Sequence, residues 1–174
     1  MCNIRKRKIN RAIGHTRRMV VFPRPETIVS VGFVLDVDAD ERNVTWNLQG
    51  TVARTQCLKY VDEKRGNDAR QEVIFRSDLN FWKLPPDKLV RSFIETPFDL
   101  LINLASDKND VITYICAASK AKFKVSYKQQ GEIYDLVIDL GESNKTELVK
   151  QLKSTLLNLN QKETLSPKQK EIEF

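Results

Sequence analysis

Residues 98–140 constrain the fold of this chain more than any other stretch. They contain two strongly apolar runs, FDLLINLA and YDLVIDL, which flank an amphipathic segment and a third, alternating run, KAKFKVSY. Short apolar runs of this kind are typical of strands buried on both faces of a sheet, and the segment after the first has helical periodicity. The stretch therefore predicts strands and a helix packed as one unit, with most strands parallel.

The preceding part of the chain continues this pattern. Residues 27–37 (TIVSVGFVLDV) are apolar and rich in β-branched residues, as expected of a central strand. An apolar residue then recurs every four positions, which predicts a helix through about Gln56 with an inner face of Val44, Leu48 and Val52. Short strands are expected over residues 57–61 and 72–75, and Pro85-Pro86 opens a further helix, because proline suits a first helical turn.

Three features of the second half of the chain give more detailed expectations. Ser106 and Asp107 are the expected cap of the helix after the FDLLINLA run. Residues 121–127 alternate, which predicts a half-exposed strand with Lys122, Lys124 and Ser126 on the solvent side. A capping-box pattern from residue 144 opens the most regular helix, whose inner face is Leu148, Leu152, Leu156 and Leu159.

Strands that alternate with helices in this way imply crossover connections. We therefore expect an α/β fold, a three-layer Rossmann-like sandwich with a mainly parallel sheet of about five to six strands, preceded by a basic N-terminal helix or arm. The links after residues 61 and 127 contain no helix, so local antiparallel pairing is the alternative there.

Basic residues are concentrated at the N-terminus. Residues 1–25 hold eight Lys or Arg and no acid, whereas the rest of the chain holds 21 basic and 23 acidic residues. The formal net charge of +6 therefore belongs entirely to this segment. We expect three parts: a basic arm or helix over residues 1–25, an α/β domain over residues 26–160 and a polar tail over residues 161–174.

Several classes of protein do not fit the composition. No apolar run reaches the roughly 20 residues that span a bilayer, and no apolar core follows the basic start as a signal peptide requires. A cytoplasmic location is therefore expected. Three scattered cysteines and one histidine, His15, favour neither a disulfide framework nor a zinc site.

Four motifs resemble those of an uncharacterised family of small proteins from Bacteroidota. They are Asn80-Phe81-Trp82 before a helix, FDLLINLA, YICAASKAKFKV and YDLVIDL, although Ser126 stands where the family commonly has glycine. More distantly, the succession of strand, helix and S-x-A-x-F-x-V is similar to the Rossmann-like N-terminal half of GT-B heptosyltransferases. The first resemblance implies a fold without an activity, and the second implies architecture only.

Polar residues at the expected strand ends are candidates for a ligand site. Asp36 and Asp38 follow an apolar strand, as in aspartate-dependent phosphotransferases, but the Lys, the hydroxyl and the second carboxylate pair of that chemistry are not recognisable. Neither G-x-G-x-x-G nor G-x-x-x-x-G-K-[ST] occurs. No catalytic residue, metal ligand or cofactor is therefore predicted; the alternative function is a small Rossmann-like enzyme or a nucleotide- or phosphate-binding module using Asp36, Asp38, Asn103 and Asp139.

The basic segment gives the leading functional hypothesis. Its cations can neutralise phosphates and release counterions, which provides affinity without reading sequence. It contains only one aromatic residue, Phe22, so stacking on unpaired bases is not expected from the segment itself. We therefore expect a non-enzymatic domain that binds RNA or an RNA-rich assembly such as the ribosome, with protein partners also compatible, through Arg5, Lys6, Arg7, Lys8, Arg11, Arg17 and Arg18.

Overall fold

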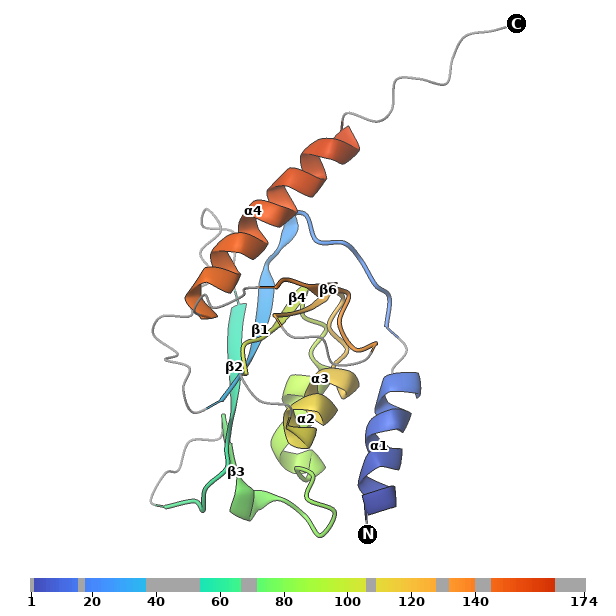
Figure 1. The fold of residues 1–174 in the computed structure, drawn as a ribbon, viewed down its shortest axis with the longest axis vertical. Helices are drawn as coiled ribbons and strands as arrows, with labels where there is room; N and C mark the ends of the chain where they lie inside the picture. Colours follow the sequence, from blue (N-terminus) through green and yellow to red (C-terminus); the bar gives the residue numbers. More distant parts are fainter. Residues whose placement is uncertain are drawn as a thin grey trace, which may run out of the picture.

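A computed structural model of the chain shows a three-layer α/β sandwich of Rossmann type (Figure 1). The structure describes residues 2–15, 18–36, 54–66, 72–105, 109–127, 132–139 and 145–164. Within these ranges six strands form one sheet in the order β3-β2-β1-β4-β5-β6, and all neighbouring strands are parallel. The strands are β1 (Ser30–Leu35), β2 (Arg54–Val61), β3 (Val73–Phe75), β4 (Leu100–Asn103), β5 (Lys124–Ser126) and β6 (Leu136–Val137).

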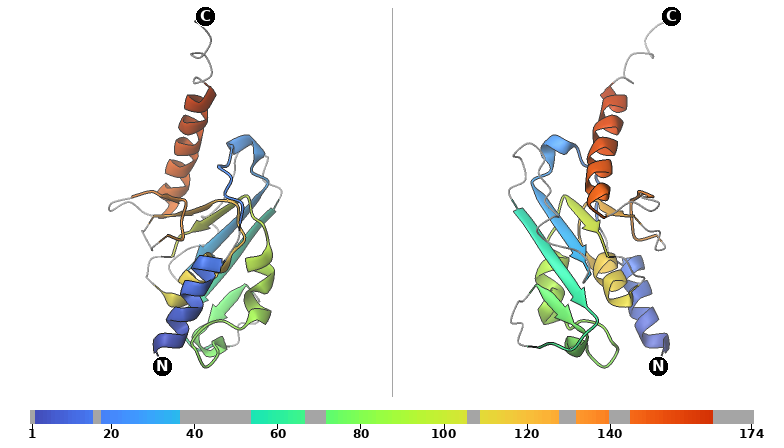
Figure 2. Two further views of the ribbon diagram at one scale, coloured as in Figure 1. Left: turned by 90° about the vertical axis from the view of Figure 1, so that its right-hand side faces the viewer. Right: turned by 60° about the vertical axis from the view of Figure 1, so that its left-hand side comes forward.

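Helices cover both faces of the sheet. The described helices are α1 (Cys2–His15), α2 (Asp87–Glu95), α3 (Asp110–Ala118) and α4 (Lys145–Thr164), with 3₁₀ turns η1 (Pro25–Thr27) and η3 (Arg76–Asp78). Helices α2 and α3 contribute to the core on one face, and α4 contributes to the core on the other. Figure 2 shows α1 running alongside α3, outside the sheet. The expected fold class, including the N-terminal helix, is confirmed.

The two cores follow from the two-residue periodicity of the strands. In β1, Val31, Phe33 and Leu35 pack in the core that contains Leu152 and Leu156 of α4. Val34 points to the opposite core, where Val90 and Phe93 of α2 and Ile112 of α3 are buried. Central strands with apolar residues at every position are therefore buried on both faces, which explains their uninterrupted apolar runs.

A glycine allows the close packing of β1 against the chain that leads into β4. A Cβ atom at Gly32 would lie 2.8 Å from Cδ2 of Phe98 and 3.0 Å from Cδ1 of Leu101. The Phe98 ring is fully buried and also packs against Phe93, with 5.1 Å between ring centroids. Gly32 thus provides the space that this ring occupies beside the central strand.

One question that the sequence leaves open has an answer here, and one expectation about the strands is wrong. The pairing is parallel for both β2–β3 and β5–β6, so the antiparallel alternative does not apply. Strand β5 is not half-exposed, because Lys124 and Ser126 are 2% and 0% exposed. The end of α3 covers the face that carries Lys124, and the buried lysine is accommodated there because its Nζ donates to the Cys116 carbonyl.

Helix boundaries also differ from expectation. Residues 54–56 lie in β2 rather than in a helix, while residues 37–53 fall outside the described ranges. The N-cap of α3 is Asn109, whose Oδ1 accepts from the Val111 N–H at 2.8 Å, instead of Ser106 or Asp107. Helix α4 continues to Thr164, and of its expected inner leucines Leu152 and Leu156 are buried. The side chains of Leu148 and Leu159, and Asn144, lie outside the described set.

Replacing Gly32 by alanine should destabilise the fold by about 1–3 kcal/mol, because the new methyl group collides with the buried Phe98 ring. Urea unfolding followed by circular dichroism measures the change. The matched control is Gly14→Ala in α1, where a Cβ meets no atom within 4 Å. That substitution should stabilise the chain slightly, by about 0.5–1 kcal/mol, through helix propensity. Equal effects of the two substitutions would contradict this account.

Candidate nucleic-acid interface

Helix α1 is attached to the domain by one face. Ile9 is 6% exposed, and Ala12 is half-buried against the core that α3 helps to form. Arg5 is on the same face, since it precedes Ile9 by four residues, and its Nη2 lies 2.7 Å from Oδ2 of Asp110 at the start of α3. The inner face of α1 is therefore narrow, with one apolar anchor and one ion pair.

The rest of α1 faces solvent and is strongly basic. Helix α1 contains no acidic residue, and the side chains of Lys6, Arg7, Lys8 and Arg11 are exposed. Arg7 and Arg11 are four residues apart and Lys8 and Arg11 are three apart, so these three cations form one continuous patch on the helix surface. A surface of this kind attracts anions such as phosphate.

The segment after α1 runs along the domain instead of projecting from it. The Val21 N–H donates to the Lys122 carbonyl at 3.2 Å. The Phe22 ring packs edge-to-face on Phe123, with 5.4 Å between centroids. Pro23 and Pro25 are buried as well. These contacts tie the basic N-terminus to the chain that enters β5.

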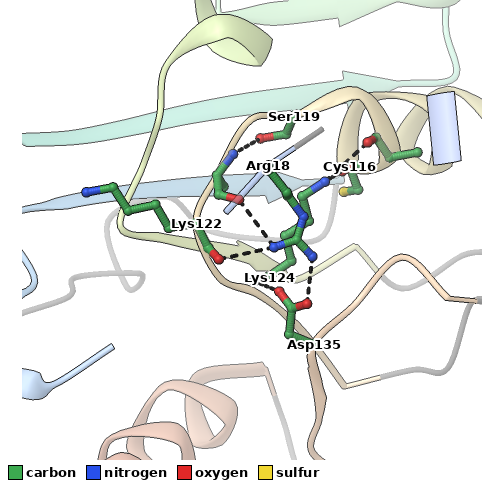
Figure 3. Close-up of polar contacts among 8 residues, drawn as sticks. Arg18, Cys116, Ser119, Lys122, Lys124 and Asp135 are labelled. Carbon is green, nitrogen blue, oxygen red and sulfur yellow. Dashed lines mark hydrogen bonds and ion pairs between the residues drawn. The ribbon is translucent and has the colours of Figure 1, made fainter. Parts of the chain in front are cut away.

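Arg18 makes the strongest of these attachments (Figure 3). Its Nη2 lies 2.6 Å from Oδ1 of Asp135, and its Nη1 donates to the carbonyls of Lys122 at 3.1 Å and Ala121 at 3.4 Å. The two charged side chains are only 12% and 15% exposed. Because Oδ2 of Asp135 accepts from the Lys124 N–H at 2.8 Å, one carboxylate holds both the N-terminal segment and β5.

Lys124 is buried next to this pair. Its Nζ donates to the carbonyls of Cys116 at 2.6 Å and Ala117 at 3.2 Å, so it satisfies the last turn of α3. Burial, followed by the charge of Arg18, lowers the pKa of Lys124 to about 8. The amine closes the C-terminal end of α3, where the helix dipole favours a positive group.

The predicted ligand residues lie along the carboxyl edge of the sheet but at a distance from one another. The strand register aligns four residues side by side across the sheet: Val34, Asn103, Ser126 and Val137. Asp36 and Asp139 each follow this row by two residues, just beyond the ends of β1 and β6 respectively. Three strand spacings separate them, or about 14 Å at about 4.8 Å each. Asp38 lies outside the described residues. A joint ligand site for these residues stays a prediction.

The side chain of Asn103 already makes hydrogen bonds within the fold. It is fully buried; its Nδ2 donates to the Tyr134 hydroxyl at 2.7 Å and its Oδ1 accepts from the Ala105 N–H at 3.0 Å. A pocket of about 570 Å³ lies elsewhere, between the first half of β2 and α2, and includes none of the predicted ligand residues. Its lining is Thr55, Gln56, Cys57, Leu58, Glu72, Lys88, Leu89, Ser92 and Phe93.

The structure therefore divides the predicted cations into two groups. Arg5 and Arg18 bind carboxylates of the domain, whereas Lys6, Arg7, Lys8 and Arg11 remain at the surface. Arg17 and the side chain of His15 lie outside the described residues. Sequence reasoning missed Asp135 and Lys124 as anchors. The signal for Asp135 was a lone carboxylate near the start of an apolar run.

In the described part of the chain, no group of three or more His, Cys, Asp or Glu side chains is arranged to hold a metal ion. None of the helices placed by the structure combines the length and the apolarity that a bilayer crossing needs.

Arg18→Met should destabilise the protein by about 2 kcal/mol, because it leaves Asp135 and two carbonyls without their guanidinium partner. Arg24→Met is the matched control in the same segment, where the side chain is exposed. The control should change the free energy of unfolding by less than about 0.5 kcal/mol. Equal losses in the two variants would mean that Arg18 does not anchor the segment.

The stability of the wild-type chain relative to Lys124→Met should rise with pH between about 8 and 10.5. Below this window Lys124 holds its proton in both states; within it only the unfolded chain, with the ordinary pKa of 10.5, keeps the proton. The unfolded state then binds more protons, so the free energy of unfolding increases with pH. Urea titrations of both chains at pH 7.5 and 10 measure the difference. A gap that stays constant would contradict the buried amine.

The comparisons with known proteins give a family without an assigned activity. Neither a curated protein nor a solved structure matches the chain. A model for a family of unknown function, DUF6913, matches residues 3–159, which covers α1 and all six strands. The chain therefore belongs to the DUF6913 family.

Proposed function

We propose that this protein is a non-enzymatic domain that binds RNA, or an RNA-rich assembly such as the ribosome, through the solvent-facing side of α1. The observation that carries the proposal is the exposure of Lys6, Arg7, Lys8 and Arg11 on a helix without acids. Each cation that contacts a phosphate releases a condensed counterion, which gives affinity independent of base sequence.

The attachment of α1 supports this proposal. Ile9, the Arg5–Asp110 pair and the Arg18–Asp135 pair fix the helix and the segment behind it on the domain. An isolated helix of 14 residues is marginal in water, so its cations would otherwise have to be ordered when a partner binds. On the folded domain the helix is already ordered, so binding does not include the entropy cost of ordering it. The exposed cations therefore present a fixed pattern of charge.

The test is a fourfold variant, Lys6→Gln, Arg7→Gln, Lys8→Gln and Arg11→Gln, in the full-length chain. Fluorescence anisotropy with a labelled RNA oligonucleotide should show loss of binding at physiological salt. The dependence of log K on log salt should flatten by about 0.7 for each lost contact with a single-stranded phosphate. Substitution is preferable to deletion of residues 1–24, since deletion also removes the Ile9, Arg18 and Phe22 contacts.

A control with the same loss of charge separates α1 from general electrostatics. Arg54, Lys64, Lys88 and Lys120 are exposed and lie outside α1, so their fourfold change to Gln removes four positive charges elsewhere. This control should retain most of the RNA affinity. Equal weakening by both variants, or no binding by the unmodified chain at any salt concentration, would refute the proposal.

A further inference from the structure

A tight turn displays two aromatic rings at the surface. Phe81 is 78% exposed and Trp82 is 40% exposed, and their rings meet edge-to-face at 6.4 Å. The turn is closed by Asn80, whose carbonyl accepts from the Lys83 N–H at 2.8 Å. Oδ1 of Asn80 accepts from the Trp82 N–H at 2.9 Å and the Leu84 N–H at 3.2 Å. The rings therefore project from a hydrogen-bonded turn.

The turn is held firmly on both sides. Before it, Arg65 binds Asp78 through two nitrogens, at 3.1 Å and 2.7 Å, and holds the pKa of that carboxyl below its usual range. After it, Leu84 is 2% exposed and fixes the chain in the core. Lys83 has φ 56°, a left-handed conformation that is uncommon for a residue with a side chain. Such strain persists only where the surroundings impose it.

The fold places this turn against the basic helix. Lys8 Nζ lies 4.1 Å from the centroid of the Trp82 ring, a cation–π contact between segments far apart in sequence. Figure 1 shows the loop between β3 and α2 reaching the N-terminal half of α1. The turn at residues 80–83 thus places two aromatic rings beside α1, a helix that contains no Phe, Tyr or Trp.

Three described carboxylates, two that flank the turn in sequence and one at the start of α3, are paired within the protein. Asp78 pairs with Arg65, Asp87 with Arg91 at 3.2 Å, and Asp110 with Arg5 at 2.7 Å. Lys83 follows the two rings directly and is exposed. Exposed rings bordered by unmatched cations suit a partner that offers both flat π faces and negative charge. Nucleic acid has both in its bases and phosphates.

We infer that α1 and the turn at residues 80–83 together bind a single-stranded segment of RNA. Unpaired bases stack on Phe81 and Trp82, while the adjoining phosphates contact the patch formed by Arg7, Lys8 and Arg11. This inference rests on the proposed function and narrows its substrate class. Paired bases in an A-form duplex are stacked on one another and do not offer a free face to such rings, so unpaired segments are the preferred ligand.

Single exposed hydrophobic residues are common on protein surfaces and need no explanation. Here two adjacent rings share one hydrogen-bonded turn, and a lysine from another element lies over one of them. Aromatic residues are also enriched where proteins bind proteins. The unmatched positive charge on the bordering helix favours the polynucleotide, and the experiment below distinguishes the two.

The experiment measures binding of three labelled probes of equal length to the full chain: an unstructured RNA 12-mer, an RNA duplex and an abasic phosphate strand. Trp82→Ala and Phe81→Ala should each weaken the 12-mer by at least about fivefold and leave the abasic strand unchanged. Met19→Ala and Val20→Ala, at exposed apolar positions on the segment after α1, are the matched controls and should bind like the wild type.

Tryptophan fluorescence gives a second, independent readout. The chain has two tryptophans, so Trp46→Phe leaves Trp82 as the only reporter. Its emission should be quenched by the 12-mer and not by the abasic strand. Trp82→Phe in the otherwise unmodified chain should remove most of the quenching while it retains a ring for stacking. This variant keeps the test valid if Trp46→Phe fails to fold.

The outcomes separate the inference from the proposed function. Binding of all three probes with equal affinity, no quenching and no effect of the Phe81 and Trp82 substitutions would overturn the inference and leave α1 as a phosphate-binding helix. No binding of any probe would overturn both, as expected if this surface binds a protein instead. Preference for the 12-mer with quenching, both lost on Trp82→Ala, supports the inference.

Discussion

The carboxylate of Asp135 links the N-terminal segment to strand β5. One carboxylate oxygen accepts from Arg18, and the other accepts from the Lys124 N–H at the start of β5. The side chain of the same lysine donates to the Cys116 carbonyl in α3, so the connection extends to that helix. Helix α1 packs on α3 and is followed directly by the Arg18 segment, so this ion pair acts together with Ile9 and the Arg5–Asp110 pair in fixing the basic helix. A partly buried pair with several hydrogen bonds suits this task better than a surface salt bridge, which contributes little.

Ion pairing to the domain determines which positive charges are available to a partner. Arg5 and Arg18 are bound to carboxylates, whereas the other described cations of α1 are exposed. The high charge of the N-terminus therefore has two roles, attachment and display. A sequence count of basic residues cannot separate these roles, because the separation depends on which side of the helix meets α3.

The sequence was sufficient for the elements with a strong apolar signal. Continuous apolar runs predict β1 and β4, and the helices expected after Pro85-Pro86 and after the FDLLINLA run are α2 and α3. The apolar pattern does not determine that β5 and β6 pair in parallel, because a short link contains no information about strand direction. Alternation alone predicts that Lys124 faces solvent. The side chain is buried instead because the end of α3 covers that face and bonds to the lysine.

The candidate site was less predictable, for a physical reason. Lys8 and Trp82 come together only through tertiary packing. No sequence pattern around either residue indicates that the two are in contact. The motif Asn80-Phe81-Trp82 was visible, but its meaning depends on the Asn80 hydrogen bonds that close the turn. Polar residues at the strand ends are also evident in the sequence. The Asn103 side chain, however, is hydrogen-bonded to the Tyr134 hydroxyl and to the Ala105 N–H.

The partners of Arg18 have a consequence for how the protein is made. Asp135 follows Arg18 by 117 residues, so a ribosome that adds about 5–20 residues each second produces the helix roughly ten seconds before its anchor. During this interval α1 is a short basic segment without the surface that orders it. Contacts of such long sequence separation also slow folding. Helix α1 is synthesised before every other described element of the fold, and it is one of the last that can reach its final place.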